Sequence, residues 1–214
     1  MIPKKIHYCW FGGNPPPKPV TKCINSWKKH CPDYEIIGWN EQKFDISTAP
    51  IYVREAYEHK KYAFVSDYVR LYAMYNYGGI YMDTDVEVVK PLDDILQNDA
   101  VFGFEECGFI ATSFMAAKEN NSFIKEFMEL YNNEIFVKSD GSLNTKTNVE
   151  RLTPLLEGKS LKKDNSFQIL DGGIAVYPKD YFSPFDNSTG VLHKTENTLA
   201  IHWMKLYIYL LIFP

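Results

Sequence analysis

Gly78-Gly-Ile-Tyr-Met-Asp-Thr-Asp-Val-Glu-Val-Val89 is the stretch of sequence that decides the fold. Its two glycines predict the end of a helix, because glycine readily adopts the left-handed conformation of a helix cap. The apolar run that follows predicts a short buried strand. Acidic residues then alternate with other residues, and this period of two predicts Asp83, Asp85 and Glu87 on one face of an extended chain.

Two neighbouring carboxylates repel each other, and a divalent cation is the usual remedy. Oxygen-rich ligands favour magnesium, manganese or calcium over zinc. A calcium loop of the EF-hand type would need glycine and glutamate where the chain has Val88 and Asp94. An aspartate-nucleophile phosphatase remains an alternative, although its expected threonine or valine is Glu87 here. A metal that grips a nucleotide diphosphate suits a DxD pattern best, since phosphate oxygens and waters complete its ligand shell.

The residues before the glycines predict a buried helix, because Ala63 to Tyr75 is apolar almost all round. Its few polar residues are Ser66, Asp67 and Arg70, whose spacings of three and four place them on one face. We interpret this group as a holder for sugar hydroxyls, with a simple structural ion pair as the alternative.

The N-terminal region predicts a strand, a loop, a helix and a second strand, over Lys5–Phe11, 12–19, Val20–His30 and Tyr34–Trp39. This order is a βαβ unit and predicts an α/β fold with parallel strands. Trp10, at the end of the first strand, is either a platform for a nucleotide base or a core tryptophan.

The second half of the chain predicts shorter elements. The expected strands are 100–104, 112–117, 166–170, 174–177 and 198–203; the expected helices are 122–132 and 148–156, with a polar loop over 137–147. His202 ends the last of these strands, where it is either a further metal ligand or a structural histidine.

The 214 residues fit a single domain, and the formal net charge of −4 argues against a nucleic-acid partner. The four cysteines form no CxxC pair, which argues against structural zinc. No signal peptide is apparent, so we expect a cytoplasmic protein with reduced thiols. The apolar run Leu206–Phe213 is too short for a membrane span, which needs roughly 17 to 25 residues. It is a docking strand, a membrane-surface foot, or a tail packed on the domain.

Four motifs in this order resemble the DXD-containing sugar transferases. They are Ile2–Gly13, Ser26-Trp27 with Pro32, Ala63–Arg70 and Gly78–Val86, and residues 177–184 and 195–203 are similar to the family's C-terminal part. This family includes bacterial capsular polysaccharide transferases and fungal mannosyltransferases, and it is similar to the catalytic domains of large glucosylating toxins. The resemblance implies a GT-A fold, a single-domain Rossmann-like mixed sheet flanked by helices, over residues 1–205, followed by an apolar tail over 206–214.

The resemblance also implies a nucleotide-sugar donor, most often a UDP-sugar, with Mn²⁺ or Mg²⁺ and retention at the anomeric carbon. Trp10 would stack on the base. Asp67 and Arg70, next to Ser66, would hold the donor sugar and the diphosphate. Asp83, beside Tyr81, would contact ribose or sugar and reach the metal through water. Asp85 would bind the metal directly, and His202 would be a ligand of the metal or of the diphosphate.

The family commonly follows its histidine with a small residue and Ser-Trp, whereas this chain reads His202-Trp-Met-Lys-Leu-Tyr207. Either Lys205 takes over the phosphate contact, or the lid over the diphosphate is altered, or the chain is truncated. We expect a glycosyltransferase that acts on a glycan or lipid-linked saccharide in capsular or surface polysaccharide synthesis. It would work in the cytoplasm, at the inner face of the membrane if the tail gives peripheral association. The alternatives are a nucleotide-sugar-binding protein without transfer activity and the aspartate-nucleophile phosphatase.

Overall fold

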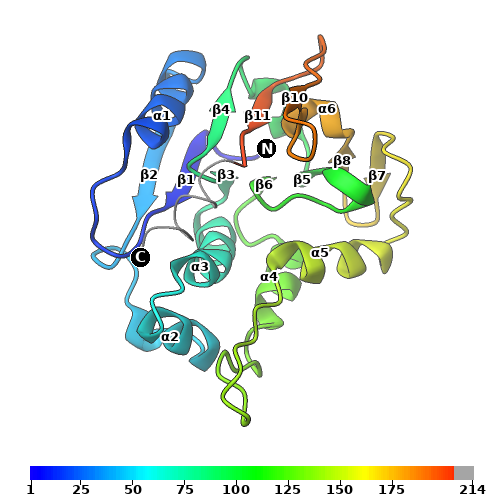
Figure 1. Cartoon of the computed structure of the whole chain (residues 1–214). Coiled ribbons are helices and arrows are strands. Elements are labelled where there is room, and N and C mark those ends of the chain that lie inside the picture. The colour runs from blue at the N-terminus through cyan, green and yellow to red at the C-terminus, as the bar shows by residue number, and fades with distance from the viewer. Residues whose placement is uncertain (205–214) are drawn as a thin grey trace.

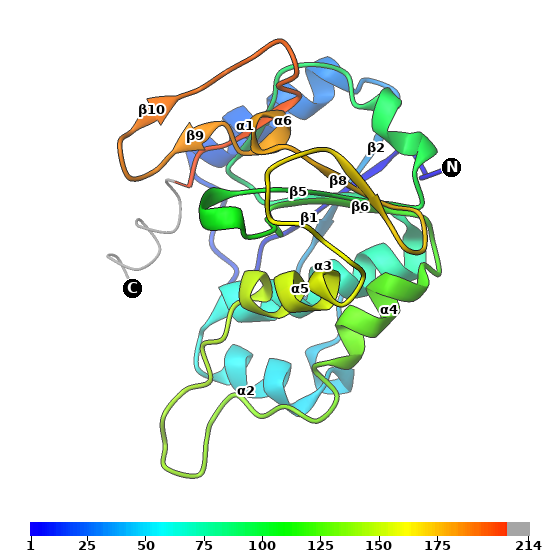
Figure 2. The same ribbon diagram turned by 90° about the vertical axis from the view of Figure 1, so that its right-hand side faces the viewer.

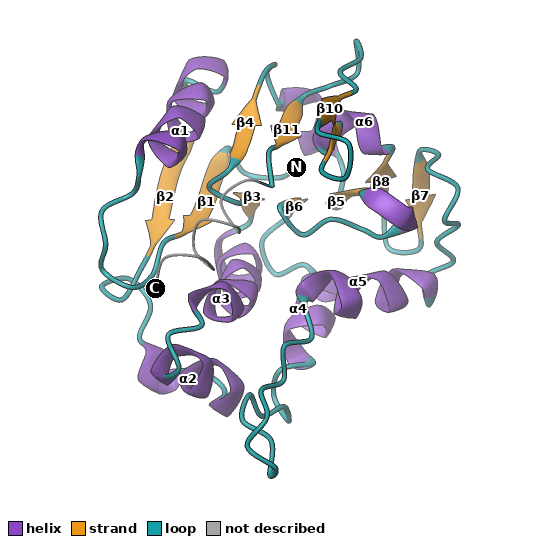
Figure 3. Cartoon of the chain, viewed as in Figure 1, coloured by secondary structure: helices purple, strands orange, loops and turns teal. Residues whose placement is uncertain are grey.

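The computed structural model describes residues 1–204, and its centre is a seven-stranded mixed sheet (Figure 3). The strand order is β2-β1-β3-β6-β5-β8-β7. The strands are β1 (Lys5–Cys9), β2 (Glu35–Trp39), β3 (Gly79–Met82), β5 (Ala100–Gly103), β6 (Phe114–Ala117), β7 (Gln168–Leu170) and β8 (Ile174–Tyr177).

The direction of the strands determines which strand ends meet at the same edge of the sheet. β1 runs parallel to β2, as the βαβ pattern predicted, and also to β3, so the carboxyl ends of these three strands share one edge of the sheet. β6 is antiparallel to β3 and β5, and β5 is parallel to β8. The mixed sheet of the implied GT-A fold is therefore confirmed.

Helices cover both faces of the sheet (Figure 2). The helices are α1 (Lys18–His30), α2 (Ile51–Glu58), α3 (Tyr62–Tyr77), α4 (Ser122–Glu129), α5 (Asn148–Glu157) and α6 (Lys179–Phe182), with short 3₁₀ turns at Ile46–Thr48, Asp93–Gln97 and Glu106–Gly108. β3 shows the two-sided packing. Its Ile80 and Met82 share a buried cluster with Trp27 of α1, whereas Tyr81 lies in the other cluster with Val69 of α3. α2 to α5 form the layer on the Tyr81 side (Figure 1).

Two small antiparallel sheets complete the fold. One joins β4 (Val86–Val88) to β11 (Ala200–His202), and the other joins β9 (Phe185–Asp186) to β10 (Val191–Leu192). The pairing of β4 with β11 matters for function, because it carries His202 to the end of β3.

Gly78 ends α3, as its sequence predicted. Its φ of 57° and ψ of 178° lie in a region that side-chain-bearing residues avoid. A Cβ at this position would lie 2.6 Å from the backbone nitrogen of Glu119. Glycine is therefore required here both by conformation and by space.

The prediction of three carboxylates on one extended face is wrong. Asp83 to Val86 form a turn, closed by a 3.0 Å hydrogen bond from the Val86 amide to the Asp83 carbonyl, and only then does β4 begin. The turn breaks the period of two. Glu87 consequently accepts a hydrogen bond from Trp203 Nε1 and lies 3.8 Å from Lys22 Nζ. Asp83 and Asp85 instead lie close to His202.

Within residues 1–204, no helix is both long and apolar enough to cross a membrane. Lys205 and the apolar tail at 206–214 lie outside the described residues, so the predicted domain boundary and the phosphate contact of Lys205 stay predictions.

Candidate active site

The candidate site lies where β1, β2 and β3 end together. Open α/β sheets bind ligands at this edge, because loops diverge there and leave a crevice. The loops after β1 and β2 enclose a cavity of about 360 Å³. Its lining residues are Tyr8, Trp10, Gly13, Asn14, Pro16, Gly38, Trp39, Asn40 and Glu41. Trp10 is half-buried in this wall, and its Nε1 donates a 2.6 Å hydrogen bond to the Asn14 carbonyl, which fixes the ring against the loop.

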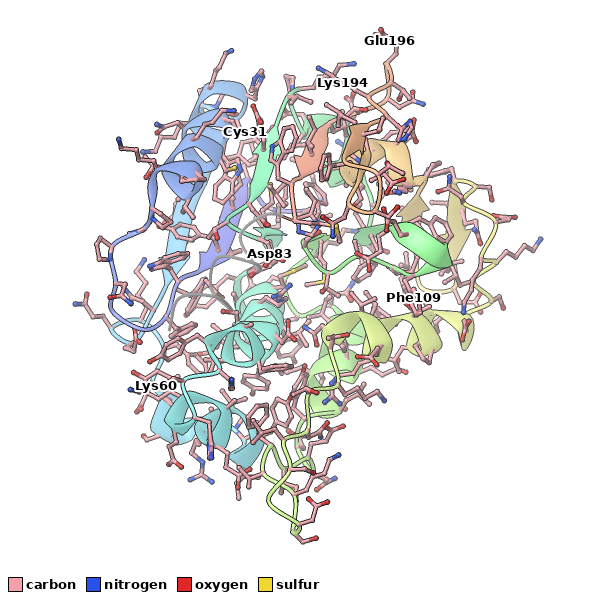
Figure 4. All side chains as sticks on the ribbon, viewed as in Figure 1. Cys31, Lys60, Asp83, Phe109, Lys194 and Glu196 are labelled. Atoms are coloured by element: carbon pink, nitrogen blue, oxygen red, sulfur yellow. The ribbon has the colours of Figure 1, made fainter. Side chains whose placement is uncertain are left out.

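Asp83, Asp85 and His202 meet at the end of β3 (Figure 4 labels Asp83 beside α3). One ligand atom from each residue lies within 4.8 Å of the other two. The register of β11 against β4 pairs His202 with Val86, and the Trp203 amide donates to the Asp85 carbonyl at 3.1 Å. Residues that are far apart in the sequence are thus held together by a backbone ladder.

The electrostatics of this cluster favour a cation. Burial lowers the pKa of His202, but the Asp85 carboxylate, 3.4 Å from Nε2, together with Asp83 and Glu105 raises the pKa above its usual value. The Nδ1 atom of His202 is buried without a hydrogen-bond partner among the described residues. Two carboxylates and one imidazole are a donor set that suits manganese or magnesium, so these three residues fit a divalent metal.

Arg70 connects α3 to the cluster. Its Nη2 lies 2.9 Å from Asp67 Oδ1 and 3.3 Å from Asp83 Oδ1, and its Nη1 donates to the Thr112 carbonyl at 2.7 Å. The guanidinium also lies 4.6 Å from the centre of the Tyr81 ring. The predicted shared face of Asp67 and Arg70 is thus present, and it extends to the first aspartate of the DxD pattern.

Ser66 and Tyr81, the other two residues predicted to contact the nucleotide sugar, form hydrogen bonds with groups of the protein itself. Tyr81 is buried, and its hydroxyl donates a 2.8 Å hydrogen bond to Asp83 Oδ1. Ser66 donates its hydroxyl to the Tyr62 carbonyl, and its own carbonyl accepts from Arg70 Nε at 3.2 Å. Tyr81 therefore helps to orient the Asp83 carboxylate, and Ser66 helps to orient the Arg70 guanidinium.

Asp67 is a buried carboxyl with an altered pKa. Burial raises the pKa to about 6, and the Arg70 guanidinium opposes this rise. The side chain of Asn148, at the start of α5, donates a 2.8 Å hydrogen bond to the Asp67 carbonyl. The sequence did not predict this contact. It did contain a sign of where α5 begins, because Thr147 and Glu150 have the spacing of a capping box and form one.

The two glutamates after β5 differ in their surroundings. Glu106 accepts from Lys179 Nζ at 3.4 Å and from the Asn187 amide at 3.2 Å, so it has a structural role. Burial raises the pKa of Glu105, and the charge of His202 opposes this rise. Glu105 therefore lies within electrostatic range of His202.

Comparison with known families agrees with this geometry. Residues 17–102 match the family described as "Glycosyltransferase sugar-binding region containing DXD motif". The matched segment includes α3, β3 and both aspartates, whereas His202 lies outside it.

Two curated relatives come from Schizosaccharomyces pombe. Inositol phosphoceramide mannosyltransferase 3 is 33% identical over 102 residues, which cover 46% of this chain and 28% of the relative. Inositol phosphoceramide mannosyltransferase 1 is 30% identical over 105 residues, which cover 44% of this chain and 31% of the relative. The chain thus spans less than a third of the length of these relatives.

Among solved structures, the PaToxG glycosyltransferase superposes with a TM-score of 0.55 at 20% identity, over 73% of this chain and 69% of the other. At this identity the likeness shows the fold. Together the comparisons confirm the predicted resemblance to DXD glycosyltransferases and the GT-A type of fold.

Proposed function

We propose that this DXD-type glycosyltransferase uses a divalent metal to transfer a sugar from a nucleotide-sugar donor, a UDP-sugar, to a glycan or lipid-linked saccharide. One observation carries the proposal. The Asp83–Asp85–His202 cluster lies at the same sheet edge as a cavity whose wall includes Trp10. A nucleotide diphosphate needs both features, an aromatic surface for its base and a metal for its phosphates.

The donor would lie across the ends of β1 and β3. The base occupies the cavity beside Trp10, and the diphosphate reaches the cluster. Arg70 is already engaged with Asp67 and Asp83, so its contribution to the donor is to fix the two carboxylates and to add positive charge near the phosphates. Manganese or magnesium would supply charge stabilisation for the leaving diphosphate.

We propose that transfer retains the configuration of the anomeric carbon by attack on the same face as the departing phosphate. The bond from the anomeric carbon to the acceptor oxygen forms as the bond to the phosphate oxygen breaks. The electron pair goes to the leaving phosphate, which also takes the acceptor's hydroxyl proton. Glu105, within electrostatic range of His202, would orient that hydroxyl. This chemistry would serve capsular or surface polysaccharide synthesis in the cytoplasm, at the inner face of the membrane.

The test is a panel of nucleotide sugars assayed for nucleotide release with and without Mn²⁺. We expect metal-dependent release with one donor, and Asp85→Asn should lower kcat/KM by roughly 100-fold or more, as loss of a transition-state charge contact does. Asp171→Asn, an exposed aspartate after β7, is the matched control and should retain wild-type activity. Equal release with and without metal by wild type and Asp85→Asn would contradict the proposal.

A second candidate, a nucleotide-sugar-binding protein without transfer activity, is favoured by one observation. Trp203, which directly follows His202, donates its Nε1 to Glu87 and packs its ring 5.4 Å from Phe185. In this position Trp203 is part of the packing of the small sheets. Calorimetric binding of a nucleotide sugar, without nucleotide release in the presence of any glycan or lipid-linked acceptor tested, would establish this second candidate.

A further inference from the structure

Glu87 is the acidic residue beside the DxD pattern that the candidate site does not use. Among residues 1–204, the candidate metal cluster is made of Asp83, Asp85 and His202. The Glu87 side chain is nonetheless only 23% exposed, and its Oε2 accepts a 2.9 Å hydrogen bond from Trp203 Nε1. Trp203 directly follows His202, so Glu87 is bonded to the neighbour of a candidate metal ligand.

β4, the strand that carries Glu87, is held along both of its edges (Figure 1). On one edge α1 provides Trp27, whose Nε1 donates to the Val86 carbonyl at 2.8 Å. The hydroxyl of Ser26, also in α1, accepts from the Val88 amide at 2.9 Å. On the other edge, β11 pairs with β4 in an antiparallel register. β4 is therefore fixed independently of β11, and the place of β11 depends on what ties it to β4.

The two ends of β11 are anchored in different ways. Its start follows Leu199, whose amide donates to a carbonyl of α6 and whose carbonyl accepts from the Val89 amide, both at 2.9 Å. Its end carries His202 and is followed by Trp203, whose amide donates to the Asp85 carbonyl at 3.1 Å. A two-stranded ribbon with three residues in each strand is only marginally stable on its backbone bonds. A side-chain contact at this end therefore matters for the place of His202.

The hydrogen bond between Trp203 and Glu87 fits one register of β11. Glu87 is opposite Ile201, so Trp203, two residues further along, lies on the same face of the ribbon as Glu87. A slip by one residue would turn Trp203 to the opposite face and His202 away from the aspartates. The Trp203 ring also packs against Phe185, at 5.4 Å between ring centres, which limits the motion of the indole.

An ion pair with Lys22 is a weaker explanation for Glu87. Lys22 Nζ lies 3.8 Å from Glu87 Oε2, and the Lys22 side chain is 74% exposed. Exposed ion pairs contribute little, because water and salt screen the two charges. The shorter contact of Glu87 is with Trp203, an uncharged donor, so the carboxylate serves mainly as a hydrogen-bond acceptor.

We propose that Glu87 is a positioning residue that holds the end of β11 through Trp203 and thereby keeps His202 at the two aspartates. The inference rests on the proposed function, because it concerns the metal that His202 and the aspartates would hold. Groups that orient a metal ligand commonly contribute roughly 10- to 100-fold in metal affinity. Glu87 would act one step further away, through the backbone that joins Trp203 to His202.

The experiment is a Mn²⁺ titration of the full chain, with free Mn²⁺ measured by electron paramagnetic resonance. Glu87→Ala removes the acceptor, and we expect it to weaken Mn²⁺ binding by roughly 10-fold or more. Glu87→Gln keeps an oxygen acceptor for the indole N–H without the charge, so it should recover most of that affinity. Trp203→Phe keeps an aromatic ring beside Phe185 but lacks the donor, and it should weaken binding as Glu87→Ala does.

Hydrogen–deuterium exchange in EDTA tests the same contact without metal. In Glu87→Ala the Trp203 amide should exchange roughly fivefold or more faster than in wild type, because the end of β11 opens more often. The Val89 amide, bonded to Leu199 at the start of β11, should exchange as in wild type. This comparison separates a local effect on the end of β11 from a general loss of stability.

Two control variants change neighbouring charges and leave the hydrogen bond intact. Lys22→Gln removes the ion pair with Glu87, and Glu196→Ala removes a fully exposed glutamate that precedes β11. Both should bind Mn²⁺ like wild type. Wild-type Mn²⁺ affinity in Glu87→Ala would overturn the proposal. Equal losses in Glu87→Ala and Glu87→Gln would overturn it as well, since they would mean that the charge of Glu87 acts on the metal directly.

Failure of this proposal is distinguishable from failure of the proposed function. If wild type binds Mn²⁺ and releases nucleotide, and Glu87→Ala binds Mn²⁺ equally well, only the role of Glu87 is wrong. If wild type binds no Mn²⁺, the metal dependence of the proposed function is contradicted, and the role of Glu87 is overturned with it.

Discussion

Arg70 is the residue on which the charged part of the site depends. Its guanidinium reaches Asp67, Asp83 and the Thr112 carbonyl at once, because its donors point in several fixed directions. A lysine keeps the charge but can reach fewer of these groups. We expect Arg70→Lys to lower kcat/KM by roughly 10- to 100-fold, measured as nucleotide release with the preferred donor.

The control for Arg70→Lys is Arg54→Lys, an exposed arginine on α2. It should leave both activity and melting temperature unchanged. Wild-type kinetics in Arg70→Lys would mean that positive charge alone is sufficient, and that the multiple contacts of the guanidinium are dispensable.

His7 should make the protein less stable in acid. Trp39 Nε1 donates to His7 Nδ1 at 3.1 Å, so the proton is on Nε2, which donates to the Gly78 carbonyl at 2.8 Å. Burial lowers the pKa of His7 from 6.5 to about 4. The unfolded chain therefore takes up a proton first as pH falls, and the free energy of unfolding decreases between pH 6.5 and about 4.

The loss attributable to His7 is about 3 kcal/mol over this range. Urea unfolding at pH 7 and at pH 4.5 measures it, as the difference between wild type and His7→Gln. His193→Gln, at an exposed position, should keep the wild-type pH dependence. If His7→Gln keeps it as well, other groups cause the acid sensitivity.

Single residues show how far local sequence predicts this site. Asp67 and Arg70 are three apart on one helix, so their contact follows from helical geometry. Thr112 reaches Arg70 only because β6 pairs with β3, and the sequence contains no local sign of that pairing. The place of His202 at the end of a strand left it either a metal ligand or a structural histidine, and the family resemblance favoured the ligand.

At the scale of elements, the connection between α3 and β3 fixes the direction in which the aspartates point. We expect Gly78→Ala to reduce the free energy of unfolding by about 2 to 4 kcal/mol, because an unfavourable backbone conformation and a steric clash act together. Gly141→Ala is a matched control, since Gly141 also has a positive φ of 80° but open space around it. It should cost only about 1 to 2 kcal/mol.

Chemical denaturation in urea separates the two glycine variants. Equal losses would mean that the neighbourhood of Glu119 and Pro3 relaxes around the new methyl group. A loss confined to Gly141→Ala would contradict the assigned role of Gly78.

The start of α5 should support the donor site through Asn148. Its amide nitrogen donates to the Asp67 carbonyl, and its amide oxygen accepts from the buried Tyr131 hydroxyl. Asn148→Ala removes both bonds and should lower the free energy of unfolding by about 1 to 3 kcal/mol. Asn133→Ala, in the exposed turn after α4, should have little effect in the same urea titration. An unchanged free energy of unfolding in Asn148→Ala would mean that water replaces the amide side chain.

The elements that the sequence failed to predict are short or depend on distant partners. β9 and β10 have two residues each and are strands because they pair with one another. The turn at Asp83–Val86 was mistaken for extended chain because its residues alternate like a strand. α2 was overlooked although Pro50 directly precedes it, a position where proline commonly begins a helix.

For the whole molecule, the sheet order is the part that the sequence could not predict. Local patterns identify β1, β2 and β3 and their parallel direction, which is enough to locate the ligand-binding edge. The insertion of β6 between β3 and β5 depends on packing between segments that are far apart in the chain. The same long-range packing brings β11 to the end of β3 and completes the candidate metal site.

A metal bound there should stabilise the folded protein as a whole, because its ligands come from the middle and the end of the described chain. Unfolding separates His202 from the aspartates and destroys the site, so binding is restricted to the folded state. At a free Mn²⁺ concentration of 100 times Kd, the stabilisation is about 2.7 kcal/mol, or on the order of 5 to 10 °C in melting temperature. Differential scanning fluorimetry in Mn²⁺ and in EDTA measures this shift. Asp85→Asn and His202→Gln should abolish it, and Asp171→Asn should not. A shift that survives in His202→Gln would place the metal on the two aspartates alone, and the pairing of β11 with β4 would then serve packing without metal binding.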